Sequence, residues 1–166
     1  MRTMRFTLLP AAALAFLITV TSEAHGNQIE GLWDVVVWIT DCVSGTPTPA
    51  PPIRAMIMFT RDGKVVETAG TPLLGPIPIQ RVSPGLGTWQ HQGQRHFTAA
   101  FTFFRINVPP TAAVPFSFAG TQTITEDIEL SQDGSEFSAI GTSQVVNADG
   151  TTPAETCNTL AGVRRP

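Results

Sequence analysis

The chain has no tyrosine, two cysteines and few charges, because Asp, Glu, Lys and Arg make up 14% of its 166 residues and the net charge is −3. A weakly acidic chain with no basic cluster is not expected to bind nucleic acid. The sequence also lacks a nucleophile elbow, a zinc-protease helix motif, a phosphate-binding loop and a dinucleotide-binding fingerprint. His91 and His96 have no third ligand at metal spacing, so we expect no metal site and no cofactor.

The N-terminal segment resembles a secretory signal peptide more than a part of the fold. Arginines precede an apolar run over residues 8–20, and the small residues Ser22 and Ala24 follow it. The run is shorter than the roughly 20 residues that cross a membrane as a helix. We therefore expect residues 1–24 to be removed and residues 25–166 to form one secreted or periplasmic domain that is not an integral membrane protein. His25 would then be the first residue, where an amine and an imidazole can chelate copper, but no other feature supports a copper site.

The rest of the sequence has the pattern of strands and no helical period. Apolar and polar residues alternate in windows that Gly, Pro, Asn and Asp separate. This spacing is typical of an antiparallel meander, which forms either a barrel or a sandwich. The eight expected strands are 31–42, 53–60, 64–69, 85–91, 95–106, 119–131, 135–146 and 155–165.

The connections between these strands are of two kinds. Asp62-Gly63, Gln92-Gly93 and Asp133-Gly134 predict tight hairpin turns, since Gly readily adopts the positive φ that such turns need. The alternate connections are long and rich in proline. In a meander the alternate connections lie at the same end, so we expect one tightly closed end and one end surrounded by four long loops.

The two cysteines decide between a barrel and a sandwich. In an oxidising compartment Cys42 and Cys157 are expected to form a disulfide. If they lie directly opposite each other, Asp34 faces Arg165 and the first strand pairs with the last. The fold class we predict is therefore all-β, an eight-stranded antiparallel up-and-down barrel closed by its first and last strands.

Both ends of the domain resemble the calycins, the lipocalin and avidin-like barrels. Gly31-Leu32-Trp33 resembles their G-x-W motif on the first strand, and Arg164 or Arg165 resembles the arginine that packs over that tryptophan from the last strand. The predicted register places Trp33 diagonally beside Arg164. The resemblance implies a structural role for Trp33 and Arg164 and a ligand inside the barrel, and the expected disulfide gives Cys42 and Cys157 a structural role as well.

Strand alternation predicts which side chains point inward. If the strands that flank Asp133-Gly134 form a hairpin, Glu126 faces Gly141 on the inner side, with Ala99 beside it. Arg105 would also point inward, near the loops. The candidate ligand-binding residues are Arg105, Glu126, Phe97, Phe101, Phe103, Ile124 and Gln122. Three alternatives stay open: an internal Arg105–Glu126 ion pair, a partly solvated barrel interior, and phenylalanines that only pack the core.

Three functions fit these residues. The first is a secreted lipocalin-like barrel that binds a small hydrophobic or amphipathic ligand without catalysis. The second is a cofactor-free isomerase or cyclase of the allene-oxide-cyclase-like barrel type, with Glu126 as acid or base. The third is a structural protein of the envelope. An outer-membrane barrel is not expected, because the outer faces are polar. The sequence names neither a ligand nor an oligomeric state.

Overall fold

A computed structural model describes residues 28–70, 79–108 and 115–166, so the expected signal peptide and His25 lie outside the described residues. Within these ranges there is no helix, and hence none long and apolar enough to cross a membrane. The described residues form nine strands: β1 (Gly31–Thr40), β2 (Ile53–Phe59), β3 (Lys64–Gly70), β4 (Ile79–Arg81), β5 (Gly85–Gly93), β6 (His96–Asn107), β7 (Ser117–Leu130), β8 (Glu136–Asn147) and β9 (Thr156–Arg164).

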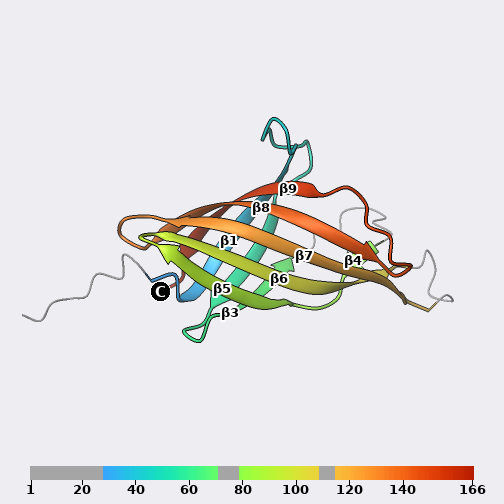
Figure 1. Ribbon diagram of the computed structural model, residues 1–166, viewed down its shortest axis with the longest axis horizontal. Helices are drawn as coiled ribbons and strands as arrows, with labels where there is room; N and C mark the ends of the chain where they lie inside the picture. The colour runs from blue at the N-terminus through green and yellow to red at the C-terminus, as the bar shows by residue number, and fades with distance from the viewer. Residues whose placement is uncertain (1–27, 71–78, 109–114) are drawn as a thin grey trace, which may run out of the picture.

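Eight of these strands close into an antiparallel barrel, as predicted (Figure 1). The order around the barrel is β1-β2-β3-β5-β6-β7-β8-β9, and β9 pairs back to β1. β4 is an additional three-residue strand in a segment that the sequence analysis treated as a loop. It pairs with the end of β6, beyond the part of β6 that β5 covers, and therefore extends the wall at that end.

Strand alternation separates the inner from the outer face as expected. On β6 the side chains of Phe97, Ala99, Phe101 and Phe103 are buried, whereas Thr102 is exposed. The β7–β8 register is also confirmed, because Glu126 pairs with Gly141 and its other neighbour across the sheet is Ala99.

The register predicted between the first and last strands is wrong by two residues. Cys42 and Cys157 do form a disulfide, with Cα atoms 5.1 Å apart and a sequence separation of 115 residues. However, Cys157 lies opposite Thr40, because β1 ends at that residue. The chain then turns at Asp41, whose carboxylate accepts hydrogen bonds from the backbone amides of Val43 and Ser44. The turn brings Cys42 back towards β9.

This shift changes the contacts at the ends of β1 and β9. Trp33 lies directly opposite Arg164, and Asp34 lies opposite Val163. The expected ion pair between Asp34 and Arg165 still forms, but diagonally across the two strands, with Arg165 Nε 2.7 Å from Asp34 Oδ2.

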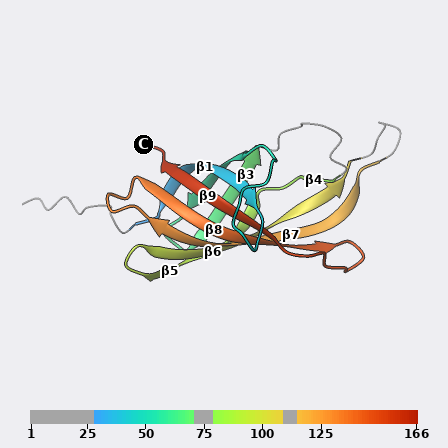
Figure 2. The ribbon, with the colours of Figure 1, turned by 90° about the horizontal axis from the view of Figure 1, so that it is seen from above.

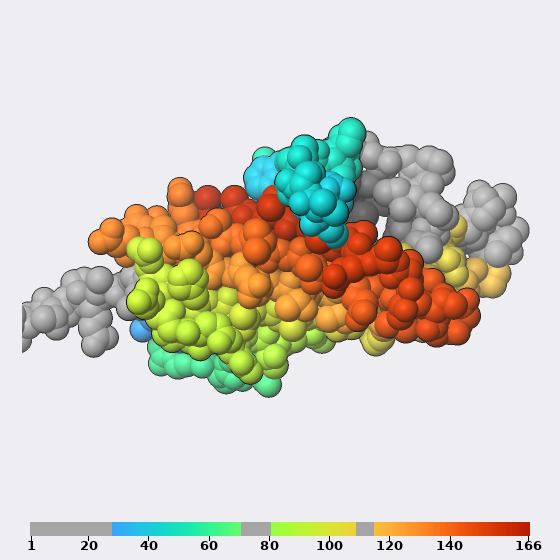
Figure 3. All heavy atoms as spheres, turned by 45° about the horizontal axis from the view of Figure 1, so that its top comes forward, coloured from blue at the N-terminus to red at the C-terminus, as the bar shows by residue number. Residues whose placement is uncertain are grey.

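The short turns lie at one end of the barrel, as predicted, whereas two of the four long connections predicted at the other end include residues 71–78 and 109–114, which lie outside the described residues. At the closed end, short turns join β2 to β3, β5 to β6 and β7 to β8. One turn is displaced from the prediction: Gln94 and Arg95 form it, and Gly93 lies in a bulge of β5. At the open end, β6 and β7 diverge from the β8–β9 connection (Figure 2). The connection between β1 and β2 stands out from the barrel surface (Figure 3).

The closed end is packed and sealed. Trp33 is fully buried, donates a hydrogen bond to the Ile29 carbonyl at 2.8 Å and packs its edge against Phe137. The Arg164 guanidinium lies 4.3 Å from the Trp33 ring centroid and donates a hydrogen bond to the Gly134 carbonyl at 2.8 Å. Gly31 has a φ of 128°, and a Cβ there would lie 2.9 Å from Arg164 Nη1. Glycine at this position therefore allows the arginine to close the end.

Candidate functional site

A cavity of about 160 Å³ lies inside the barrel, between the packed closed end and the open end. Every strand of the barrel except β5 contributes side chains to its wall, and the exposed Thr156 lines it at the open end. The wall is apolar except for a few polar groups. The lining residues are Val37, Ile39, Ile53, Ala55, Ile57, Glu67, Ala69, Arg81, Phe101, Phe103, Gln122, Ile124, Glu126, Ser143, Thr156, Asn158 and Leu160.

One side of the cavity holds a buried ion pair that the sequence analysis did not identify. Both guanidinium nitrogens Nη1 and Nη2 of Arg81 donate to the Glu67 carboxylate, the first at 2.9 Å. The Arg81 guanidinium also stacks on Phe103, with its Cζ atom 3.4 Å from the ring centroid. A bidentate pair of this kind fixes both side chains and neutralises the Glu67 charge inside the barrel.

Glu126 is the second carboxyl group inside the barrel. It is 1% exposed, and its Oε2 atom has no hydrogen-bond partner among the described residues. Burial raises the pKa of Glu126 to about 8, and repulsion from Glu67 adds to this increase. Glu126 is therefore a neutral carboxylic acid at pH 7, which can donate a hydrogen bond as well as accept one.

Asn158 lies beside Glu126 across one intervening strand. On β8, Gly141 pairs with Glu126 on one side and with Asn158 on the other. A Cβ atom on Gly141 would lie 2.6 Å from Asn158 Oδ1, so the Asn158 amide occupies the space above the glycine. Asn158 is 4% exposed, and its Oδ1 atom also lacks a hydrogen-bond partner within the described part of the chain.

Two further polar groups inside the cavity, Gln122 and Ser143, are paired with each other, while Thr156 lies exposed at the open end. The Gln122 amide donates to the Ser143 hydroxyl at 2.5 Å, across the β7–β8 pair. Gln122 and Ser143 therefore offer less to a ligand than Glu126 and Asn158, whose buried oxygens are unpaired.

Five of the seven predicted ligand-binding residues line this cavity: Glu126, Phe101, Phe103, Ile124 and Gln122. Phe97 does not line it, because it belongs to the packed core of the closed end, with its ring against Trp89 and His91. Whether any of the five binds a ligand stays a prediction.

Arg105 points inward but is not among the cavity-lining residues. It lies directly opposite Arg81, and its Nη1 atom is buried without a hydrogen-bond partner among the described residues. The alternative of an Arg105–Glu126 ion pair is wrong for the described residues, because Arg81 forms the internal pair and its partner is Glu67.

Sequence alternation could have identified two of the missed residues. Glu67 shares a face with Val65 and Ala69, and Asn158 shares a face with Leu160. Arg81 could not be found in this way, because it lies on the short β4, next to a proline-rich segment.

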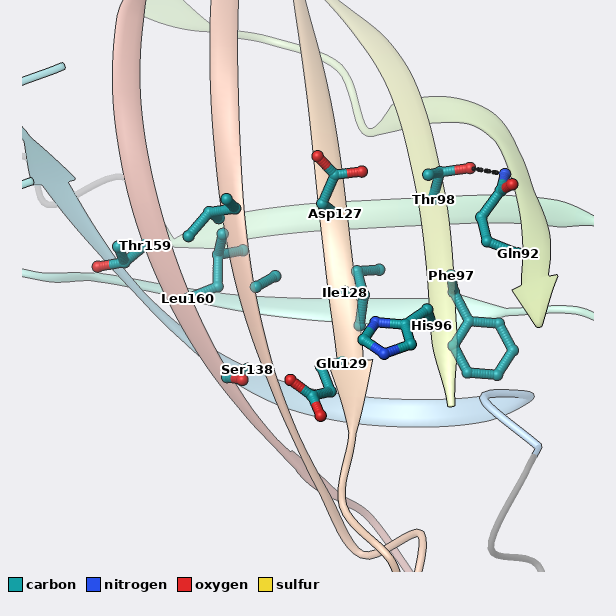
Figure 4. Close-up of a pocket in the computed structure, with 12 residues that line it drawn as sticks. Gln92, His96, Phe97, Thr98, Asp127, Ile128, Glu129, Ser138, Thr159 and Leu160 are labelled. Atoms are coloured by element: carbon teal, nitrogen blue, oxygen red, sulfur yellow. Dashed lines mark hydrogen bonds between the residues drawn. The ribbon is translucent and has the colours of Figure 1, made fainter. Parts of the chain in front are cut away.

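A second hollow lies on the outer wall, across β6 to β9 (Figure 4). Exposed side chains of His96, Asp127, Glu129 and Ser138 surround it. His96 and Glu129 are direct cross-strand neighbours. Among the described residues no group of three or more His, Cys, Asp or Glu residues is arranged to hold a metal ion. Because these polar side chains are exposed, none of them is comparable to the buried Glu126. The internal cavity is therefore the better candidate site.

The closed eight-stranded barrel is compatible with a calycin-like architecture at the level of strand order and closure. Comparisons of the sequence with protein-family models and with curated proteins find no match.

Proposed function

We propose that the protein binds one small, largely apolar ligand inside the open half of its barrel, with Glu126 as a polar anchor. The observation that supports this most is the internal cavity, in which a buried carboxyl group without a partner among the described residues lies among aliphatic and aromatic side chains. A buried polar group is costly when it makes no hydrogen bond, so the site favours a ligand that supplies one.

The size of the cavity limits the ligand. A cavity of about 150 Å³ is enough for one benzene-sized molecule, and the cavity here is about 160 Å³. A larger amphipathic ligand would extend past Thr156 towards the open end. A completely filled barrel would instead have favoured a purely structural role in the envelope.

The same proposal includes secretion. The Cys42–Cys157 disulfide fits an oxidising compartment, because such bonds are rare where thiols are kept reduced. In the proposal, residues 1–24 direct export to the periplasm or the cell exterior. The contact between Trp33 and Arg164 supports a lipocalin-like barrel, in which that pair seals the end opposite the ligand.

Titration with methylcyclohexane, followed by NMR and by thermal unfolding, tests ligand binding. We expect saturable shifts of methyl signals from Ala55 and Leu160, and a higher melting temperature. The variant Ala69→Phe fills the cavity and should abolish binding, whereas Ala161→Phe places the same ring on the outer face and should not. Native mass spectrometry of gently extracted protein would reveal a resident ligand. Absence of saturable binding to the wild type would refute the proposal.

A second candidate function is catalysis without a cofactor, as in an isomerase or cyclase. Its specific support is the raised pKa of Glu126, about 8, on a carboxyl group that borders a cavity. A general acid or base is most effective when its pKa is near the working pH. Glu126 would then move a proton to or from the bound ligand.

Exchange of the α-hydrogens of cyclohexanone in D₂O distinguishes the two functions. A catalyst would accelerate this exchange above the rate in buffer, and Glu126→Gln would remove the acceleration because an amide cannot take up the proton. A protein that only binds would leave the rate unchanged in both variants.

A further inference from the structure

Glu126 and Asn158 hold two buried oxygen atoms at the same place in the barrel wall. Both side chains line the cavity, and both residues are cross-strand neighbours of Gly141. Neither Glu126 Oε2 nor Asn158 Oδ1 has a hydrogen-bond partner among the described residues. Four other polar side chains of the wall are already engaged with each other, Arg81 with Glu67 and Gln122 with Ser143.

Gly141 makes this arrangement possible. Asn158 Oδ1 lies only 2.6 Å from where a Cβ atom of residue 141 would be, so the amide extends over Gly141, the residue that pairs with Glu126. With any larger residue at position 141, the amide would have to leave this position. The two polar groups therefore face one ligand volume instead of two separate ones.

We propose that the Glu126 carboxyl and the Asn158 amide together form a two-point site for a neutral oxygen, so that the ligand of this cavity is a small cyclic alcohol or ketone. This inference rests on the proposed function, because it assigns the chemical class of the ligand in the same cavity. The ring would lie against the apolar wall of Phe101, Ile124 and Leu160, and the oxygen against the two polar groups.

The hydrogen-bond inventory matches both classes of ligand. A neutral carboxyl group donates one hydrogen bond, and a primary amide offers one acceptor and two hydrogens. A hydroxyl oxygen accepts from Glu126 while its hydrogen is donated to Asn158. A ketone oxygen accepts from both groups, since the oxygen and nitrogen of an asparagine amide can exchange places by a flip.

The charges around Glu126 disfavour a charged ligand. Glu67 from β3 and Arg81 from β4 face the same cavity and neutralise each other. The neighbouring strands β6 and β8 bring Ala99 and Gly141 to Glu126, and neither titrates. An ammonium ligand would require Glu126 to ionise in the interior. A carboxylate ligand at Glu126 would lie beside two carboxyl groups, because Arg105, which also points inward, is not among the lining residues.

Four probes of equal heavy-atom count test the inference: methylcyclohexane, cyclohexanol, cyclohexanone and cyclohexylammonium. Their dissociation constants are measured by NMR titration with the wild type, with Asn158→Leu and with the outward control Thr159→Val. Because Asn158→Leu removes the polar group and keeps its bulk, the affinities for cyclohexanol and cyclohexanone should each fall at least about tenfold relative to that for methylcyclohexane. Thr159→Val should leave all ratios unchanged.

A second variant reports on the donor role of Glu126. Cyclohexanone only accepts hydrogen bonds, so its affinity should fall once the pH exceeds the Glu126 pKa of about 8. In Glu126→Gln the amide donates at every pH, and the affinity should not change with pH. Thermal unfolding followed by circular dichroism shows whether each variant is folded.

The outcomes separate this inference from the function it rests on. If Asn158→Leu weakens all probes equally or none of them, the cavity binds apolar ligands but the two-point site is wrong. If cyclohexylammonium binds most tightly, the site is a cation site and the inference is also wrong. If no probe binds the wild type, the proposed function itself fails.

Discussion

The closed half and the open half of the barrel are built from the same strands but have opposite interiors. The closed half is filled by large apolar side chains, among them Trp33, Phe59, Leu130 and Phe137, and Arg164 seals it. The open half contains the Glu67–Arg81 pair, Glu126 and Asn158 around a cavity. The comparison shows how one sheet can combine stability and binding, because among the described residues buried polar side chains on the inner face appear only in the open half, on β3, β7, β8 and β9.

The largest expected effect concerns packing in the closed half. Trp33→Ala should lower the free energy of unfolding by about 3–5 kcal/mol, since it leaves a large cavity in a tightly packed region. Ile124→Ala in the open half should cost only about 1–2 kcal/mol, because Ile124 already borders the cavity and loses fewer contacts. Urea unfolding followed by circular dichroism measures both. Equal losses would show that the halves are packed alike.

The next effect concerns the ion pair inside the open half. Arg81→Met should cost about 3 kcal/mol, because it leaves the Glu67 carboxylate buried without its counter-ion. The matched control is Asp34→Asn on the outer wall, where the pair with Arg165 is half-exposed and should contribute less than about 1 kcal/mol. If both substitutions cost the same in urea unfolding, the interior of the open half is as well hydrated as the surface.

Per pH unit, the smallest of the three effects is a pH dependence of stability that arises from Glu126. The folded protein keeps the Glu126 proton up to a pKa of about 8, whereas the unfolded chain loses it near 4.5. Between these values the folded state binds more protons, so its stability falls as pH rises, by at most about 1.4 kcal/mol per pH unit. Well above pH 8 both states have lost the proton, and this contribution no longer changes.

Unfolding of Glu126→Gln across the same pH range isolates this contribution. The variant should lack the downward slope, while Glu129→Gln, an exposed position on the same strand, should keep it. A wild-type slope that survives in Glu126→Gln would mean that Glu126 is ionised in the folded protein at neutral pH.

Much of the fold was predictable because local signals agreed with each other. Alternation gave the inner faces of β6 and β7, and the Asp133-Gly134 turn gave the register that places Glu126 opposite Gly141. The register of β1 and β9 was predicted two residues out, because the disulfide was assumed to join residues directly opposite each other. Only the turn at Asp41, which depends on side-chain hydrogen bonds, reveals that Cys42 lies beyond the strand.

The site was less predictable than the fold, for a physical reason. Alternation shows that Glu126 and Arg105 point inward. It predicts neither the position of each side chain along the barrel axis nor its hydrogen-bond or ion-pair partner. The Glu67–Arg81 pair forms between β3 and β4, which follow each other in the chain but do not pair in the sheet. Arg81 is positioned by β4, which has only three residues. The Asn158 amide fits over Gly141 because glycine has no side chain there. This contact depends on the β8–β9 register, in which Gly141 pairs with Asn158.

The most direct test of the difference between the two halves is a crystal structure of the protein grown with cyclohexanol. The account predicts electron density for the ring inside the open half, with the oxygen in hydrogen-bond range of Glu126 and Asn158 and the packing around Trp33 unchanged. A lumen filled by its own side chains, or cyclohexanol bound only at the outer hollow near His96, would contradict it.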